Sequence, residues 1–264
     1  MSQKAILSAP EEPYLDHIGL VVGQWKGIKG RLLPTLCRLF IRDERLIERY
    51  ILIMLALHDL GKLTSRWQTK IQSEHPEKIP TPHTPPAAAY IYYLFGPQFD
   101  QAELKDLLHA ITFAILIHHI DRGIVCPTLE RPDTLLIERG IIDYRTEKLR
   151  WHSEAEEIVE QTACLVDFSP KPISELTLSH IREVSFHLRE WSRGGAFLQL
   201  HRRRLLASAC HHILKLCDIR AAVKRVADSE GEELATHQKK LITDYVVKGG
   251  ILYAEPGNTE NRPY

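Results

Sequence analysis

Apolar residues recur at helical spacing through most of this 264-residue chain, and this periodicity is the strongest constraint on its fold. It is clearest in the stretches Leu46–Asp59 and Gln101–His119, and Gly61 suits the left-handed end of the first of these helices. A further helix is expected to begin at Pro85 or Pro86, with Thr84 as its N-cap. The same spacing predicts helices at Ser153–Val166, Ser174–Arg193 and Ala196–Asp228.

The stretch Ile120–Arg145 is less regular, because glycines and prolines interrupt it, and it could hold a turn or a short β-hairpin around residues 125–137. No internal repeat and no shift in composition marks a second domain. We therefore predict an all-α helical bundle with room for one small β-hairpin. The domain is expected to occupy residues 1–250, followed by a polar tail or linker at residues 251–264.

Composition narrows the class of protein. The 34 basic and 34 acidic side chains cancel, so the chain lacks the strong positive charge typical of many nucleic-acid-binding proteins, although a local basic face is not excluded. The five cysteines include no C-x-x-C pair, which argues against a disulfide framework. The apolar runs fall short of the roughly 18 to 20 residues of a membrane helix, and Glu11–Glu12–Pro13 would interrupt a secretion signal. We expect a soluble, cytoplasmic protein with no membrane partner.

Residues that commonly bind metals stand where predicted helices begin or end. His58–Asp59 closes one apolar helix and His118–His119 closes another, while His83 lies just before a third. Adjacent helical residues point about 100° apart, so a pair at a helix end can straddle a cavity. His17 and Asp218 stand in apolar stretches near the two ends of the series.

Each of these features has an ordinary explanation when taken alone. A single histidine such as His17 or His83 is more often hydrogen-bonded than metal-bound, and a buried Asp218 is satisfied equally well by an arginine or the backbone. Their order along one chain, His…His-Asp…His…His-His…Asp, is what favours a shared site.

In this order the sequence resembles the HD phosphohydrolase superfamily, and within it the HD nuclease of type I CRISPR systems. The resemblance covers roughly residues 17–222. Its strongest local match is His58-Asp59-Leu60-Gly61-Lys62, followed by Trp67-Gln68 where that family commonly has Phe-Gln. The fold that it implies is an HD-domain helical bundle.

The resemblance also implies a site for two metal ions. His17, His58, Asp59 and Asp218 would hold one ion, and Asp59, His83, His118 and His119 would hold the other. One carboxylate can bridge ions about 3.5 to 4 Å apart, in an arrangement that activates water against a phosphodiester. Ligands rich in imidazole and free of thiolate suit Mn, Fe, Co or Ni better than Mg or Zn. Asp59 and Lys62 are the predicted catalytic residues, with Lys62 able to hold a phosphate oxygen.

The expected substrate is single-stranded DNA. Between His180 and Arg225 the chain has ten Lys and Arg residues against three acids, which is either a solvated face or a DNA-binding surface. The residues predicted to contact nucleic acid, with Trp191 as a further stacking surface, are Arg66, Trp67, Arg202 and Arg203. No P-loop is present, so the resemblance implies a separate CRISPR helicase subunit and a crRNA-guided surveillance complex as partners.

Two other functions use the same residues. The chain could be an HD phosphohydrolase acting on nucleotides or cyclic nucleotides, or a non-catalytic docking subunit that keeps the HD fold. Four candidate zinc ligands on one uninterrupted helix could not close a tetrahedral site; they are Cys210, His211, His212 and Cys217. His211 is seven residues before Asp218 and shares its helix face, so it either borders the metal site or packs against a neighbouring element.

Overall fold

The computed structural model describes residues 5–73, 82–119 and 132–229. Its α-helices are α1 (Tyr14–Phe40), α2 (Glu44–Leu57), α3 (Ser65–Ile71), α4 (Thr84–Phe95), α5 (Lys105–Ile117), α7 (Pro132–Glu138), α8 (Ala155–Val166), α9 (Leu178–Arg193) and α10 (Phe197–Ser229). Short 3₁₀ helices are η1 (Leu60–Leu63), η2 (Gly96–Asp100) and η3 (Ile173–Glu175). The strands β1 (Leu7–Ala9) and β2 (Glu12–Pro13) pair antiparallel. The predicted all-α class is confirmed.

The helix predictions hold to within a few residues, but the predicted hairpin is misplaced. Residues 120–131 lie outside the described ranges, and Pro132–Glu138, where the second half of the hairpin was expected, is helical. Proline at the first position of a helix loses no hydrogen bond, so Pro132 opens α7 rather than a turn. The small sheet lies instead near the N-terminus, where Leu7 pairs with Pro13 and Ala9 with Glu12.

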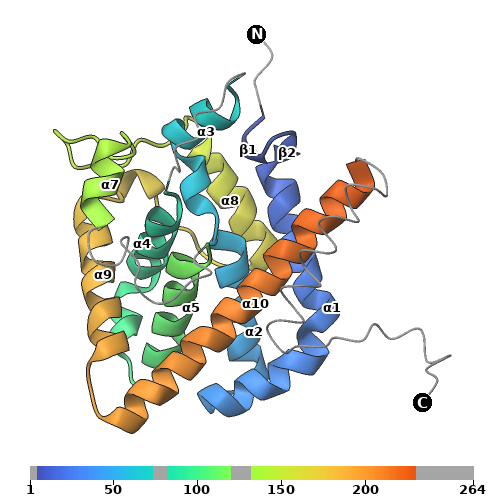
Figure 1. The fold of residues 1–264 in the computed structure, drawn as a ribbon, viewed down its shortest axis with the longest axis vertical. Helices are drawn as coiled ribbons and strands as arrows, with labels where there is room; N and C mark the ends of the chain where they lie inside the picture. The colour runs from blue at the N-terminus through green and yellow to red at the C-terminus, as the bar shows by residue number, and fades with distance from the viewer. Residues whose placement is uncertain (1–4, 74–81, 120–131, 230–264) are drawn as a thin grey trace, which may run out of the picture. The chain divides into compact units, whose positions relative to one another are not determined.

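Helix α2 forms the centre of the core. Its segment Ile53–Leu57 is completely buried, as expected for a helical stretch without a polar side chain. Helices α1, α5 and α8 pack against α2, and α4 packs against α5 and α9 (Figure 1). The last turn of α2 therefore ends inside the molecule, and whatever follows it is delivered to a buried place.

A buried glutamine ties the small sheet to the segment that follows α2. The Gln68 amide nitrogen donates to the backbone oxygens of Leu7 and Lys62, both at 2.8 Å, and its oxygen accepts from the Leu7 amide at 3.0 Å. Strand β1 thus lies against α3 and beside the start of α1 (Figure 1). This places Ser8 next to Lys62 of η1.

Gly61 does not end α2 in the left-handed conformation that the sequence favoured. It lies within η1, and the only glycines with positive φ in the described ranges are Gly140 and Gly195. The reason for a glycine is instead close approach, because a Cβ at position 61 would stand 2.0 Å from the backbone oxygen of His83. Gly61 thereby lets η1 and the start of α4 touch. Helix α4 itself begins at Thr84, so His83 and not Thr84 is its N-cap.

Residues 1–218 form one compact unit, and residues 219–264 are grouped in a second, of which the structure describes Ile219–Ser229 as the end of α10. The predicted domain boundary at residue 250 and the tail at 251–264 lie outside the described ranges. No helix within those ranges is long and apolar enough to span a bilayer.

Replacing Gly61 with alanine is expected to destabilise the fold. The new methyl group would collide with the His83 backbone, and overpacking of this kind costs about 1 to 3 kcal/mol or more. Urea unfolding measures the change in the free energy of unfolding.

Gly23→Ala is the matched control, because Gly23 is exposed within α1 and a methyl group there meets nothing within 4 Å. This variant should be stabilised by about 0.5 to 1 kcal/mol. Equal stability of the two variants would contradict the close contact between η1 and α4.

Candidate metal centre

Two histidines occupy equivalent places, each directly after a buried helix. His58 follows α2 and His118 follows α5. The Nδ1 atom of His58 lies 2.8 Å from the Leu55 backbone oxygen, and that of His118 lies 2.7 Å from the Ile115 oxygen. A carbonyl oxygen only accepts, so Nδ1 donates in both rings, and Nε2 is the nitrogen that faces the cluster and can bind a metal once it has lost its proton. The last-turn carbonyls, which have no partner within a helix, are satisfied at the same time.

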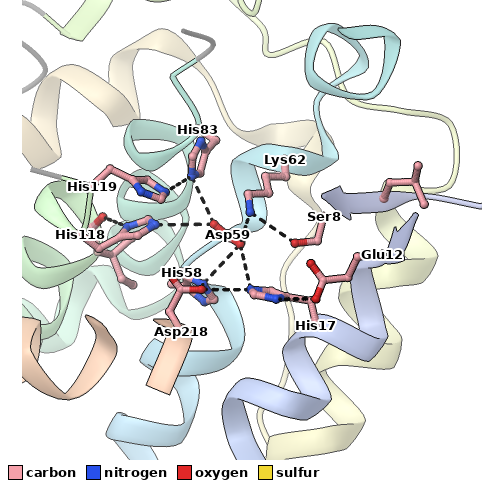
Figure 2. Close-up of polar contacts among 12 residues, drawn as sticks. Ser8, Glu12, His17, His58, Asp59, Lys62, His83, His118, His119 and Asp218 are labelled. Carbon is pink, nitrogen blue, oxygen red and sulfur yellow. Dashed lines mark hydrogen bonds and ion pairs between the residues drawn. The ribbon is translucent and has the colours of Figure 1, made fainter. Parts of the chain in front are cut away.

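The side chain of Asp59 is the point on which the imidazoles converge (Figure 2). It is almost completely buried. Its Oδ2 atom lies 3.3 Å from Nε2 of both His17 and His58. Its Oδ1 atom lies 3.2 Å from Nε2 of His83 and 3.6 Å from Nε2 of His118. Each carboxylate oxygen thus faces its own pair of histidines.

These side chains form two groups of possible metal ligands that share Asp59. One group is His17, His58 and Asp59, and the other is Asp59, His83, His118 and His119. Asp218 on α10 adds a second carboxylate to the first group, with Oδ1 at 3.4 Å from His17 Nε2 and 3.8 Å from His58 Nε2. In the second group, Nε2 of His119 lies 2.8 Å from Nε2 of His83. His119 is the exposed member of its group.

The donor set fits divalent cations. The Nε2 atoms of His17, His58 and His118 are buried without a hydrogen-bond partner, and a buried polar atom of this kind is costly unless something binds it. All three point at the same carboxylate (Figure 2). Imidazole nitrogens and carboxylate oxygens together are ordinary ligands of divalent transition metals.

The charges of the cluster are strongly coupled. Burial opposes protonation of His17, but the neighbouring carboxylates of Asp218, Asp59 and Glu12 outweigh burial and raise its pKa to about 11. Burial likewise opposes protonation of His58, yet Asp59 and Asp218 raise its pKa to about 9. Burial lowers the pKa of His83 to about 4. Burial alone would raise the pKa of Asp59, but His58 and Lys62 hold it well below its usual value, so Asp59 stays ionised.

Glu12 contacts the nitrogen of His17 that faces away from Asp59, and no sequence pattern predicted this role. Its Oε1 atom lies 3.2 Å from Nδ1 of His17, and both side chains are buried. A carboxylate on the far nitrogen of a metal-binding histidine fixes the ring and makes its other nitrogen a better ligand. Its position five residues before His17 is produced by the turn from β2 into α1, which periodicity does not reveal.

Lys62 brings a positive charge to the same carboxylate. Its Nζ atom lies 2.6 Å from Asp59 Oδ2 and donates to Ser8 Oγ at 3.3 Å. It also lies 5.5 Å from the centre of the Trp67 ring, and that ring contacts His83 with centroids 4.8 Å apart. Lys62 and Trp67 therefore border the cluster, and Arg66 is half-buried on the same helix α3.

The structure does not bring Arg202 and Arg203 to the cluster. Arg202 pairs with Asp106 near the start of α5, and about 18 Å of helix separates Asp106 from His118. Arg203 donates to the backbone oxygens of Trp191 and Gly194, at 3.0 and 2.8 Å. Both guanidinium groups therefore connect α10 to α5 and α9. The number of charges in the sequence cannot distinguish this structural role from DNA binding. Trp191 is 3% exposed, and it lines a cavity between α5, α9 and α10 rather than the outer surface.

The chain has the helical fold of an HD domain, as the sequence predicted, and a His-Asp pair and a His-His pair reach one cluster from two helix ends. No protein-family model matches the chain.

Two comparisons confirm the predicted resemblance to the HD nucleases of CRISPR systems. The chain is 26% identical over 119 residues to the CRISPR-associated endonuclease Cas3-HD of Methanocaldococcus jannaschii, a match covering 43% of this chain and 48% of that protein. The match thus spans about half the length of this relative. Among solved structures, the fold is similar to the Cas3 HD domain protein from the same organism, with a TM-score of 0.59 and 19% identity over 80% of this chain and 100% of the other.

Glu12→Gln is expected to weaken metal binding without unfolding the protein. The amide keeps the shape of the side chain but removes the charge that orients His17, and losses of this kind are typically about 10- to 100-fold in affinity. Calorimetric titration of the metal-free protein with MnCl₂ measures the change.

The control for this prediction is Glu160→Gln, the same exchange at an exposed position on α8. It should bind Mn²⁺ like the wild type. If Glu12→Gln did so as well, Glu12 would have no part in positioning His17.

Proposed function

We propose that the protein is a metal-dependent phosphodiesterase that cleaves single-stranded DNA in the cytoplasm. It would serve as the HD nuclease of CRISPR interference, acting with a separate helicase subunit and a crRNA-guided surveillance complex. The observation that carries the proposal is the pair of ligand groups that share Asp59. The similarity to an endonuclease of CRISPR systems supports the choice of substrate and partners.

One ion would be held by His17, His58, Asp59 and Asp218, and the other by Asp59, His83, His118 and His119. Bound there, two ions would supply an activated water and stabilise the charge that develops on the phosphate oxygens. The preponderance of imidazole favours Mn, Fe, Co or Ni over Mg or Zn.

The chain itself contributes orientation and charge. Asp59 stays ionised among the histidines, and Glu12 fixes the ring of His17. Lys62, beside Asp59, would bind a non-bridging phosphate oxygen as a point charge. Trp67 and Arg66 on α3 would contact the strand next to that phosphate. Arg202 and Arg203 lie away from this surface, because their guanidinium groups contact Asp106 and the backbone of α9.

The metal-loaded protein is expected to cleave labelled single-stranded DNA in Mn²⁺ or Ni²⁺. Cleavage should fall to background when EDTA is added and in the double variant His58→Ala/Asp59→Ala, which removes the shared ligand. A gel assay of end-labelled strands measures the rate.

Parallel reactions with RNA, dNTPs and cyclic nucleotides separate the alternatives. Hydrolysis of nucleotides alone would identify a nucleotide phosphohydrolase. A protein that binds metal but cleaves nothing would be a docking subunit. Residual activity in the double variant would reveal a contaminating nuclease.

Lys62→Ala is expected to lower kcat for cleavage by about a hundredfold while the metal content stays the same. The variant lacks the ammonium group that would bind a phosphate oxygen. Single-turnover kinetics and metal analysis test the two parts separately. A variant that lost its metal would show instead that Lys62 acts on the ligand Asp59.

A further inference from the structure

A cavity that contains none of the candidate metal ligands lies between α5, α9 and the first half of α10. Its volume is about 260 Å³. Small-molecule sites in proteins commonly measure about 300 to 1,000 Å³, so this cavity suits one base-sized group rather than a long ligand.

The wall of the cavity that belongs to α5 and α9 is aromatic and held rigidly. It includes Phe113 and Trp191, whose ring centroids are 6.5 Å apart. The Trp191 indole nitrogen donates to Asp106 at 3.0 Å, and the indole stacks on His109 with an interplanar angle of 23°. Because these contacts fix the indole, the cavity is formed before any ligand arrives.

The opposite wall is cationic and polar. Arg204 and Ser208 come from α10 and Arg193 comes from the end of α9, and all three residues are exposed. None of the described residues that line the cavity is acidic. Of three consecutive arginines, Arg202 and Arg203 bind the protein itself, and Arg204 faces the cavity. An aromatic wall opposite two arginines matches a nucleotide, which joins a flat base to a negative phosphate.

The cavity adjoins the metal centre along two elements. Ile117 lines it and is followed directly by His118. His211 also lines it and stands two turns before Asp218 on the same face of α10, about 10 Å along the helix. At a stacked spacing of about 3.4 Å per nucleotide, this is the span of about three nucleotides.

We propose that the cavity is a subsite for single-stranded nucleic acid. A nucleotide near the scissile position places its base against Trp191 and Phe113, and its phosphate contacts Arg204 and Arg193. The subsite rests on the proposed function for its polymeric ligand, and it gives that function a means of holding an unpaired base. Bases of a duplex, which are stacked and paired, cannot enter it.

The test measures binding without metal, so that cleavage plays no part in it. Labelled oligothymidylate and an abasic strand of equal length are titrated in EDTA with the full-length protein, and fluorescence anisotropy gives each Kd. Arg204→Ala removes the charge, and Ser208→Trp fills the cavity from an exposed position. Arg182→Ala, at an exposed arginine elsewhere on α9, is the matched control.

Wild type and Arg182→Ala should bind oligothymidylate about tenfold more tightly than the abasic strand. Ser208→Trp should lose this preference, and Arg204→Ala should weaken binding of both strands about tenfold. Equal Kd values for all four proteins, with unchanged melting temperatures, would overturn the subsite. Because metal is absent, a wild type that fails to cleave DNA would refute the proposed nuclease activity without altering this result.

Discussion

The buried carboxylate of Asp59 is the constraint on which the rest of this structure depends. An ionised group in a closed interior is tolerated only when positive charge or hydrogen-bond donors surround it. Here four imidazoles and the ammonium group of Lys62 do so, and they come from α1, η1 and the ends of α2, α4 and α5. The packing of these elements and the chemistry of the site therefore depend on each other. If one element moved away, the charge of Asp59 would lose a partner inside the protein.

The solution relies on helix ends. The C-terminus of a helix leaves carbonyl groups without partners and carries a partial negative charge. Helices α2 and α5 both end at the cluster. His58 and His118 supply hydrogen bonds to the carbonyl groups that would otherwise lack partners. The partial negative charge of these two helix ends adds to the attraction that the carboxylates exert on a cation. A His-Asp or His-His pair after an apolar helix thus serves both to end the helix and to bind.

This double role explains how far the sequence could be interpreted. Most of the helices and the candidate ligands were predictable, because apolar periodicity locates helix ends and the residue types there are distinctive, but α1 was not predicted. Glu12 and Gln68 were not, since their roles depend on how a two-stranded turn folds back onto η1. Gly61 was wrongly predicted to end a helix in the left-handed conformation. Its close contact with the His83 backbone cannot be inferred from the neighbouring residues in the sequence. The directions of Arg202, Arg203 and Arg204 depend on which neighbours pack around α10, and charge alone does not encode them.

His17 stands on the first helix and Asp218 near the end of the compact unit, yet their side-chain atoms lie 3.4 Å apart. An ion held by both would cross-link nearly the whole unit into one loop of about 200 residues, which restricts the unfolded chain much as a long-range disulfide does. Resistance to heat and to proteases would then follow the supply of metal, with the loaded form favoured in proportion to occupancy. The cell's metal content would set how long this protein survives as well as whether it acts.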